Sequence, residues 1–432
     1  MSPGDDWPGA GSFRWATGIE DTFVPQVRPG HRGLDEYELM GHYGRWRGDL
    51  DLAAGLGVRA IRYGIPWYRV NPRPGRFDWS WTDPVMEHLA VTLGLEPIVD
   101  LVHYGTPDWL DRGFADPGYP ELVAEYAGRF TERYKSLARD YTPMNEPGIA
   151  AAFCGRDGLW PPYLVGPGGY VAVLLGAIEG VGLAARAIKS ARGDARLVHV
   201  EDVGLERPSA RALRGEPGRV ERARALAADR QLDRLLPMDL ALGRVGPDHP
   251  RYRSLIERGG DENRLGRIAA LTPDWDVLGV NFYPWTNRRV GLRRSEPGDE
   301  PRVFARADPD PGGLLDVLRL VHRRYDRPVM VTETSARGDV GVRLRWMGAT
   351  IDAVDRARGE GIPVVGYTWF PLFTMIEWDY RWSRRSKDAH LLHLGLFDVA
   401  AGDPAMERAP TPLVEAYRAR VAAGVRDQGD LS

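Results

Sequence analysis

Eight short apolar segments, each ending in polar or aromatic residues, constrain the fold of this chain more than any other feature. Amphipathic patterns typical of helices separate most of these segments, for example at residues 119–139 and 312–325. Strands that alternate with helices indicate parallel β-α-β units. The eight predicted strands are residues 13–20, 58–67, 97–104, 141–146, 196–202, 275–283, 328–333 and 363–370.

The ends of these strands distinguish a closed barrel from an open sheet. Each segment finishes with side chains that can bind or react, among them Arg62, His103 and Glu333. In a barrel all eight carboxyl ends converge on one face, so these side chains would line a single pocket. The glycine-rich patterns that favour an open, nucleotide-binding sheet do not occur in the sequence. We therefore predict an α/β fold, the (β/α)8 TIM barrel.

We expect one catalytic barrel over residues 13–422. The Arg- and Ala-rich interval at about 205–272 predicts a helical insertion after the fifth strand. Residues 1–12 and 423–432 are polar or Gly-rich, so they are expected to form a disordered N-terminal segment and a frayed C-terminal tail.

The composition is that of a soluble globular protein, with 43% hydrophobic and 27% charged residues. Because the net charge is only −3, we expect no nucleic-acid or membrane partner. The apolar stretch 170–188 contains Glu179 and Arg186, which favours a packed helix over a membrane span. Cys154 is the single cysteine, and no secretory signal is visible, so we expect a cytoplasmic protein.

Two glutamates stand at predicted strand ends, where paired carboxyl groups could cleave a glycosidic bond. Glu146 lies in Asn145-Glu146-Pro147 at the fourth strand, and Glu333 ends the seventh. Glycoside cleavage needs one protonated carboxyl group to donate to the leaving oxygen and one ionised group to attack or stabilise the sugar cation.

These residues resemble the clan A glycoside hydrolases, and further motifs resemble glycoside hydrolase family 1. The resemblance covers about residues 13–418. The further motifs are residues 61–70 with Arg62, the segment 97–110 with His103, Asn281-Phe282-Tyr283, and Trp369 with Glu377-Trp378 followed by 395–397.

The resemblance implies a retaining, β-glycosidase-like hydrolase that acts on a small-molecule glycoside or oligosaccharide without cofactor or metal. It implies that Glu146 is the general acid/base and Glu333 the nucleophile, with further catalytic contributions from Asn145, Arg62 and Tyr283. The sugar-binding residues that it implies are His103, Tyr104, Trp369, Glu377, Trp378 and Glu20. The pair His390 and His393 is expected to lie in a solvated loop rather than to bind metal.

The mechanism implied by these roles makes two physical demands. Arg62 and Tyr283 should hold Glu333 ionised, by charge and by hydrogen bonding. Burial should raise the pKa of Glu146, so that it can donate a proton at neutral pH. A retaining mechanism predicts a separation of about 5–5.5 Å between the two carboxyl groups.

Several positions depart from the family pattern in the sugar-binding region. The first strand lacks the expected Gln before Glu20, Tyr104 replaces a Trp, and Thr334-Ser335 replaces Asn-Gly after the nucleophile. The interval from Trp369 to Glu377 is one residue longer than expected. Two alternatives therefore stay open: a transglycosidase that uses the same glutamates, and a non-catalytic sugar-binding barrel.

Overall fold

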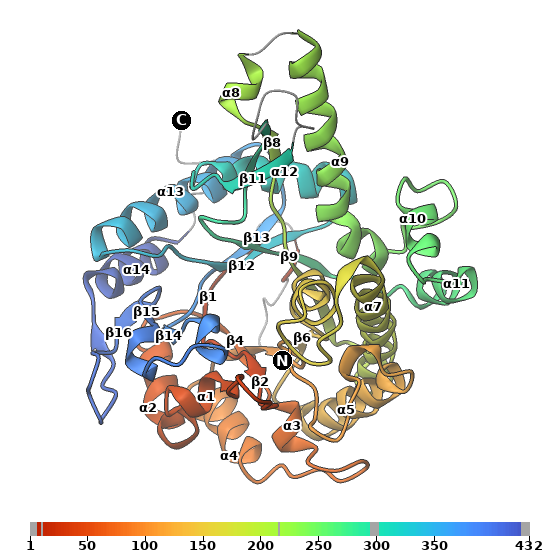
Figure 1. Ribbon diagram of the computed structural model, residues 1–432. Helices are drawn as coiled ribbons and strands as arrows, with labels where there is room; N and C mark the ends of the chain where they lie inside the picture. The colour runs from red at the N-terminus through yellow and green to blue at the C-terminus, as the bar shows by residue number, and fades with distance from the viewer. Residues whose placement is uncertain (1–6, 10–11, 215–216, 294–301, 425–432) are drawn as a thin grey trace.

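Eight parallel strands close into a barrel in this computed structural model, which describes residues 7–9, 12–214, 217–293 and 302–424 (Figure 1). The strand order is β1-β13-β12-β9-β7-β6-β5-β4, and the ring closes because β1 pairs with both β13 and β4. The predicted (β/α)8 barrel is confirmed. The barrel strands are β1 (Arg14–Gly18), β4 (Ala60–Gly64), β5 (Glu96–Asp100), β6 (Asp140–Thr142), β7 (Arg196–Asp202), β9 (Val277–Phe282), β12 (Val329–Thr334) and β13 (Val364–Trp369).

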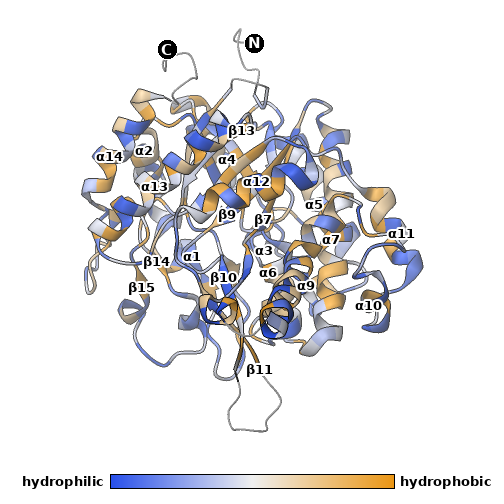
Figure 2. Cartoon of the chain, turned by 90° about the horizontal axis from the view of Figure 1, so that it is seen from above, coloured by the Kyte–Doolittle hydropathy of each residue, from blue (hydrophilic) through white to orange (hydrophobic). Residues whose placement is uncertain are grey.

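Helices surround the barrel and cover the outward-facing side chains of its strands. The longer ones are α2 (His42–Ala54), α5 (Tyr119–Tyr134), α7 (Gly166–Ala191), α9 (Pro217–Ala241), α11 (Glu262–Leu271), α12 (Gly313–Tyr325), α13 (Val340–Gly359) and α14 (Pro412–Ala423). The shorter ones are α1 (Glu36–Leu39), α3 (Trp67–Val70), α4 (Thr82–Glu87), α6 (Pro147–Ala150), α8 (Ala210–Leu213) and α10 (Tyr252–Glu257). Figure 2 shows hydrophobic strands inside this layer and hydrophilic stretches on its helices.

Small sheets outside the barrel shape the face where its strands end. Strands β10 (Arg288–Arg293) and β11 (Arg302–Ala307) pair antiparallel, and β8 (Glu206–Pro208) joins them. The remaining short pairs are β2 (Phe23–Val24) with β3 (Leu34–Asp35), β14 (Met375–Ile376) with β15 (Leu391–Leu392), and β16 (Phe397–Asp398) with β17 (Ala409–Pro410). Figure 2 shows the β10–β11 pair at one end of the molecule.

The expected helical insertion is present between β7 and β9, although it begins with β8. It comprises α8, α9, α10 and α11. Helix α7 is long and apolar enough to cross a membrane by length and composition, but 72% of its most apolar window is buried inside the protein. Glu179 of α7 pairs with Arg264 and Arg267 of α11, at 2.8 and 3.0 Å. Glu179, which interrupts the apolar stretch in the sequence, thus forms ion pairs that connect α7 to the helical insertion.

The barrel interior is filled by one apolar cluster that includes a residue from the N-terminal segment. Trp7 is 4% exposed and belongs to the cluster of Trp7, Ala16, Ala60, Ile98, Val198, Val200, Val277, Met330 and Val365. Its indole N–H donates to the carbonyl of Val365 at 2.8 Å, and Arg196 donates to its carbonyl at 2.8 Å. The guanidinium of Arg14 lies 4.1 Å from its ring centre.

The prediction that residues 1–12 are disordered is therefore wrong for residues 7–9. A large aromatic side chain closes the barrel at the amino ends of its strands, and the burial of apolar surface stabilises it there. Residues 1–6 and 10–11 lie outside the described residues. Of the predicted C-terminal tail, Ala423 ends α14, and residues 425–432 also lie outside the described part of the chain.

Trp7→Ala is expected to lower the free energy of unfolding by about 3 kcal/mol or more, because it leaves a cavity in the barrel interior. Urea denaturation followed by circular dichroism measures this loss. The control is Trp382→Ala, since the Trp382 side chain is 37% exposed and its removal should cost below about 1 kcal/mol. Equal losses in the two variants would contradict the structural role of Trp7.

Candidate active site

Glu333 ends β12 and receives the two contacts that the sequence predicts for it. Arg62, on β4, donates through Nη1 to Oε1 of Glu333. The hydroxyl of Tyr283, which directly follows β9, donates to Oε2 at 2.7 Å. Glu333 is 4% exposed, so the arginine balances a charge that is largely withdrawn from solvent.

The guanidinium of Arg62 connects Glu333 to two further strand ends. Its Nη2 lies 2.7 Å from Oδ2 of Asp100, at the end of β5, and 3.0 Å from Oδ1 of Asn145. Arg62 is only 1% exposed. Burial lowers its pKa, but the charges of Glu333 and Asp100 outweigh that effect and raise it. The site is thus built around a permanent buried cation.

Glu146 lies directly before α6, with the left-handed backbone angles φ 41° and ψ 67°. Asn281 donates to its Oε1 at 2.7 Å, and the hydroxyl of Tyr104 donates to its Oε2. The residue is 5% exposed. Burial, and after it the charge of Glu333, raises the pKa of Glu146 well above its ordinary value. These surroundings favour the protonated form of Glu146.

A continuous chain of side-chain contacts joins the two glutamates. Asn281 donates to Glu146 and also, at 3.3 Å, to Oδ1 of Asn145. The same oxygen accepts from Arg62, which in turn holds Glu333. One carboxyl group beside a guanidinium and one beside uncharged donors therefore belong to a single network, an arrangement suited to acid-assisted cleavage with nucleophilic attack.

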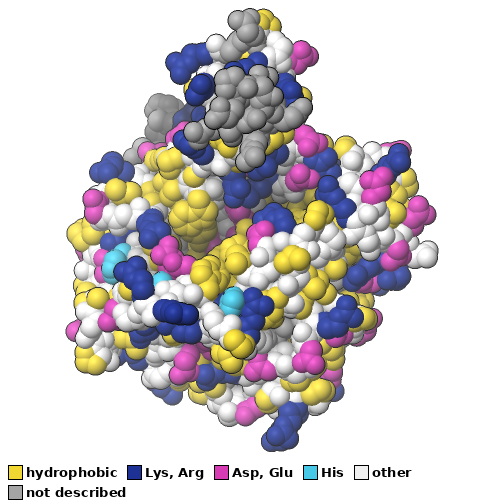
Figure 3. All heavy atoms as spheres, in the orientation of Figure 1, with side chains coloured by type: hydrophobic (Ala, Val, Ile, Leu, Met, Phe, Trp, Pro, Cys, Tyr) yellow, Lys and Arg dark blue, Asp and Glu magenta, His cyan; other side chains and the backbone are white. Residues whose placement is uncertain are grey.

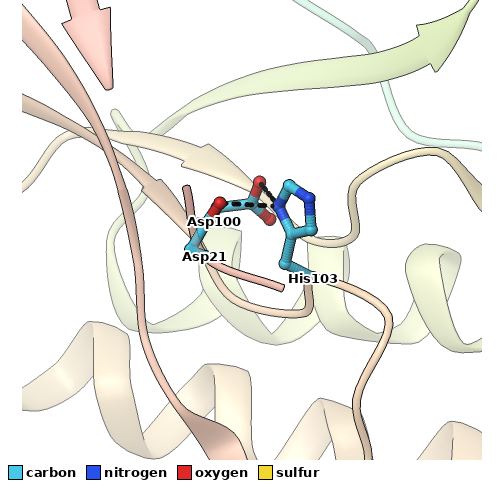
Figure 4. Close-up of side chains that lie close together, drawn as sticks. All are labelled: Asp21, Asp100 and His103. Atoms are coloured by element: carbon cyan, nitrogen blue, oxygen red, sulfur yellow. Dashed lines mark hydrogen bonds and ion pairs between the residues drawn. The ribbon is translucent and has the colours of Figure 1, made fainter. Parts of the chain in front are cut away.

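His103 is fixed beneath these residues by two carboxylates, as Figure 4 shows. Its Nδ1 lies 2.9 Å from Oδ1 of Asp21 and 3.2 Å from Oδ2 of Asp100. Burial lowers the pKa of His103, but these two carboxylates raise it well above its ordinary value. The three residues have the ligand spacing of a metal site, but in this network the positive charges next to the carboxylates are those of His103 and Arg62.

Aromatic side chains form a wall beside the acid. The ring of Tyr104 lies 5.4 Å from that of Trp378 and 5.1 Å from that of Trp160. Trp378 is partly buried, whereas Trp160 is fully buried. Tyr104 has a positive φ of 66°, so its backbone, like that of Glu146, adopts a conformation that non-glycine residues rarely hold. The structure thus brings the predicted Tyr104 and Trp378 together next to Glu146.

Trp369 does not face the site, and the prediction of its sugar contact is corrected. Its side chain is fully buried in the core, and its indole N–H donates to the carbonyl of Leu394 at 3.2 Å. The side chains of neighbouring strand residues point to opposite faces. A prediction that is wrong by one residue therefore assigns a core residue to the pocket. Phe370 is the residue beside the site: the guanidinium carbon of Arg62 lies 5.5 Å from its ring centre. The ring of Phe370 packs against Gly18, where a Cβ atom would lie only 2.7 Å from it, so a larger residue at position 18 would displace the ring.

The remaining two predicted sugar contacts differ in their surroundings. Both carboxylate oxygens of Glu377 are held by Arg337, at 2.7 and 3.4 Å. Glu20 is 6% exposed and accepts from the hydroxyl of Thr22 at 2.6 Å. Burial raises its pKa to about 7, against the lowering effect of the positive charge on His103.

Sequence reasoning did not assign a role to four residues of this network. Asn281 lies within a quoted motif and Asp100 near a predicted strand end, so the pattern of polar strand ends contained a signal for both. Asp21 directly follows Glu20 and carried the same signal. Phe370 had a signal of its own. The interval to Glu377 is one residue too long when it is counted from Trp369, and it has the expected length when it is counted from Phe370.

A separate cavity of about 320 Å³ lies on the insertion side of Glu146. Its lining begins at Gly148, two residues after Glu146, and includes Glu201, Asp202, Arg234 and Arg288. Glu201 accepts from the backbone N–H of Gly148 at 3.2 Å. Figure 3 shows this face of the molecule, which is hollowed near its centre and bordered there by hydrophobic side chains. The cavity offers space next to the acid rather than around the nucleophile.

A barrel with two glutamates at its mouth, one bound by an arginine and one by uncharged donors, is an arrangement suited to a glycosidase. The comparisons with known proteins agree. The profile of glycosyl hydrolase family 1 matches residues 17–193. Beta-glucosidase A of Thermotoga maritima is 24% identical over 375 residues, covering 80% of each chain. Thermostable beta-glucosidase B of Thermobispora bispora is 27% identical over 394 residues, covering 83% of this chain and 77% of the relative.

Solved structures show the same fold. A family 1 β-glucosidase from Thermotoga maritima superposes with a TM-score of 0.79 at 20% identity, over 97% of this chain and 99% of the other. The same enzyme in complex with isofagomine lactam gives a TM-score of 0.80 at 19% identity, over 96% and 99%. The chain belongs to glycosyl hydrolase family 1 and is a retaining β-glycosidase.

Phe370→Ala is expected to lower kcat/KM by about tenfold or more, since it removes about 1–2 kcal/mol of apolar contact beside the reacting groups. Trp369→Phe, on the adjacent position, should mainly lower the free energy of unfolding and leave KM near the wild-type value. Steady-state kinetics on an aryl β-glycoside and urea denaturation separate the two effects. A large loss of kcat/KM in Trp369→Phe, with little loss in Phe370→Ala, would show that Trp369 and not Phe370 contacts the sugar.

Proposed function

We propose that Glu333 attacks the anomeric carbon of a β-linked small-molecule glycoside while Glu146 protonates the leaving oxygen. The bond between the sugar and the leaving group breaks, and a covalent glycosyl-enzyme forms on Glu333. Glu146, now ionised, then takes a proton from water, and the resulting attack releases the sugar with its configuration retained.

The observation that carries these roles is the electrostatic difference between two glutamates of equal burial. Glu333 has Arg62 and Tyr283 as hydrogen-bond donors, which favours its ionised form. Glu146 receives only uncharged donors, Asn281 and Tyr104. Since burial and the charge of Glu333 both raise its pKa, the proton belongs on Glu146.

The other predicted residues support these two. Asn145 accepts from Arg62 and donates to His103 and the hydroxyl of Tyr104, so it fixes the space between the two glutamates. We propose that the leaving group occupies the cavity that begins at Gly148, because that cavity lies on the side of the acid. The arginine on Glu333 gives no advantage to a non-catalytic sugar-binding protein, which makes that alternative less favourable.

We also propose that the protein acts in the cytoplasm. The support is its single cysteine, Cys154, which is free and fully buried. Burial raises the pKa of its thiol, so it is an unreactive core residue and not a redox group.

Glu333→Gln should abolish turnover of every glycoside, because no other described group can form the covalent intermediate. Glu146→Gln should slow hydrolysis of an unactivated glycoside by about 10²- to 10⁴-fold and retain much of the rate with a dinitrophenyl leaving group, which needs no protonation. Added azide should then yield the β-glycosyl azide. Glu201→Gln is the matched control, since it also neutralises a buried strand-end carboxyl group, and it should give no azide product. Full activity of either glutamate variant would refute the assignment.

The dependence of kcat/KM on pH should follow the protonation of Glu146. Its pKa is raised in the folded protein, so activity should persist through neutral pH and fall as rising pH removes the proton. With the dinitrophenyl substrate, Glu146→Gln should lose this alkaline decline while the acidic limb persists. An unchanged alkaline decline in that variant would assign the proton donor to another group.

A further inference from the structure

Two buried carboxylates on the sugar side of the site have no cationic partner among the described residues. Several other carboxylates of the site are paired with a cation: Glu333 and Asp100 with Arg62, Asp21 with His103, and Glu377 with Arg337. Glu20 and Glu36 receive only uncharged hydrogen-bond donors. This difference points to a positive charge that the ligand must supply.

Thr22 holds these two residues next to each other. Its hydroxyl donates to Oε1 of Glu20 at 2.6 Å, and its carbonyl accepts from the backbone N–H of Glu36 at 3.1 Å. Pairing of the short strands β2 and β3 sets this register, with Phe23 opposite Asp35. Thr22 therefore links the segment that follows the first barrel strand to the start of helix α1.

Glu36 directs an unsatisfied oxygen into this region. It is 1% exposed, and its Oε2 accepts from the backbone N–H of Ile376 at 3.0 Å. Its Oε1 is buried and has no hydrogen-bond partner. Ile376 directly precedes Glu377 and Trp378, the segment that carries the predicted contacts to the outer part of the sugar. A buried carboxyl oxygen without a partner is costly in the free protein, and a donor from a ligand would relieve that cost.

Glu20 extends the same negative region toward the nucleophile. The charge of Glu333 raises its pKa, and its own charge raises that of Tyr283, which holds Glu333. Burial, and after it the charge of Glu20, raises the pKa of Glu36 well above its ordinary value. Burial thus favours the protonated form of both carboxyl groups, and an ammonium group beside them would favour the ionised form of one and form a charge-assisted contact with it.

We propose that Glu20 and Glu36 bind the ammonium group of an amino sugar, so that the glycon of the preferred substrate is cationic. This proposal rests on the proposed function, since it names the sugar that occupies the site next to Glu333. It also accounts for the missing amide of the first strand, because a Gln side chain could bind a hydroxyl but could not balance a charge.

The direct test compares p-nitrophenyl β-D-glucoside with its 2-, 3-, 4- and 6-amino-deoxy counterparts on the wild-type enzyme. At least one amino glycoside should show a kcat/KM about tenfold or more above the glucoside, as expected for a charge-assisted contact. Its N-acetyl derivative, which keeps the nitrogen but loses the charge, should lose this advantage.

Glu20→Gln should remove the preference, by lowering kcat/KM for the amino glycoside by about tenfold more than for the glucoside. Glu38→Gln is the matched control, because it makes the same change two residues from Glu36 at an exposed position, and it should leave the ratio unchanged. If Glu20→Gln does not fold, the wild-type ratios, together with calorimetric binding of the free amino sugars and of glucose, still decide the question.

The two proposals fail in distinguishable ways. Better cleavage of the glucoside than of every amino glycoside, with the ratio unaffected by Glu20→Gln, would overturn the amino-sugar proposal and leave the glycosidase assignment intact. Absence of p-nitrophenol release from all these substrates would count against the proposed catalytic roles, while tighter binding of an amino sugar than of glucose would still support the Glu20–Glu36 site.

Discussion

The buried guanidinium of Arg62 is the interaction on which the rest of the site depends. It contacts the carboxylates of Glu333 and Asp100 and the amide of Asn145, which come from three different strand ends. Without it, two largely buried carboxylates would lack a counter-ion, a situation that costs several kcal/mol in proteins. The proposed nucleophile is therefore withdrawn from water together with its counter-ion, while burial and then the charge of Glu333 raise the pKa of Glu146. One cation thus separates the chemical roles of two identical side chains.

The barrel allows this concentration of charge because the apolar residues that stabilise it and the polar residues of the site lie at opposite ends of the same strands. At the amino ends, Trp7 and the small apolar residues of the interior form a close-packed plug. At the carboxyl ends, polar side chains replace this packing and bind to one another instead of to the core. The backbone conformations of Tyr104 and Glu146, both left-handed, belong to the same end. Such strain persists only where the surrounding structure holds it in place.

The sequence was sufficient for the fold and for placing Glu146 and Glu333 in one site, because both depend on periodic and local signals. Strand 196–202 was predicted with its observed bounds, and Glu333 could be placed beside Arg62 because both lie on barrel strands in the half that leads to the carboxyl ends. Trp369 and Phe370 could not be separated, since neighbouring residues of a strand point to opposite faces and the local sequence does not fix which of the two points inward. The burial of Trp7 depends on contacts with residues far along the chain, such as Val365, and a polar local composition concealed it. The pairing of Glu377 with Arg337 and the unsatisfied oxygen of Glu36 are likewise properties of the folded chain alone.

The central claim is that Glu333 forms a covalent bond to the sugar, and mechanism-based labelling tests it most directly. A panel of 2-deoxy-2-fluoro β-glycosides with activated leaving groups should inactivate the enzyme with a one-to-one gain in mass. Peptide mapping should then place the fluorosugar on Glu333, and a crystal structure of the adduct should show the carboxyl group of Glu146 about 5–5.5 Å from that of Glu333. A label on another residue, or turnover with inversion and no label, would contradict this account.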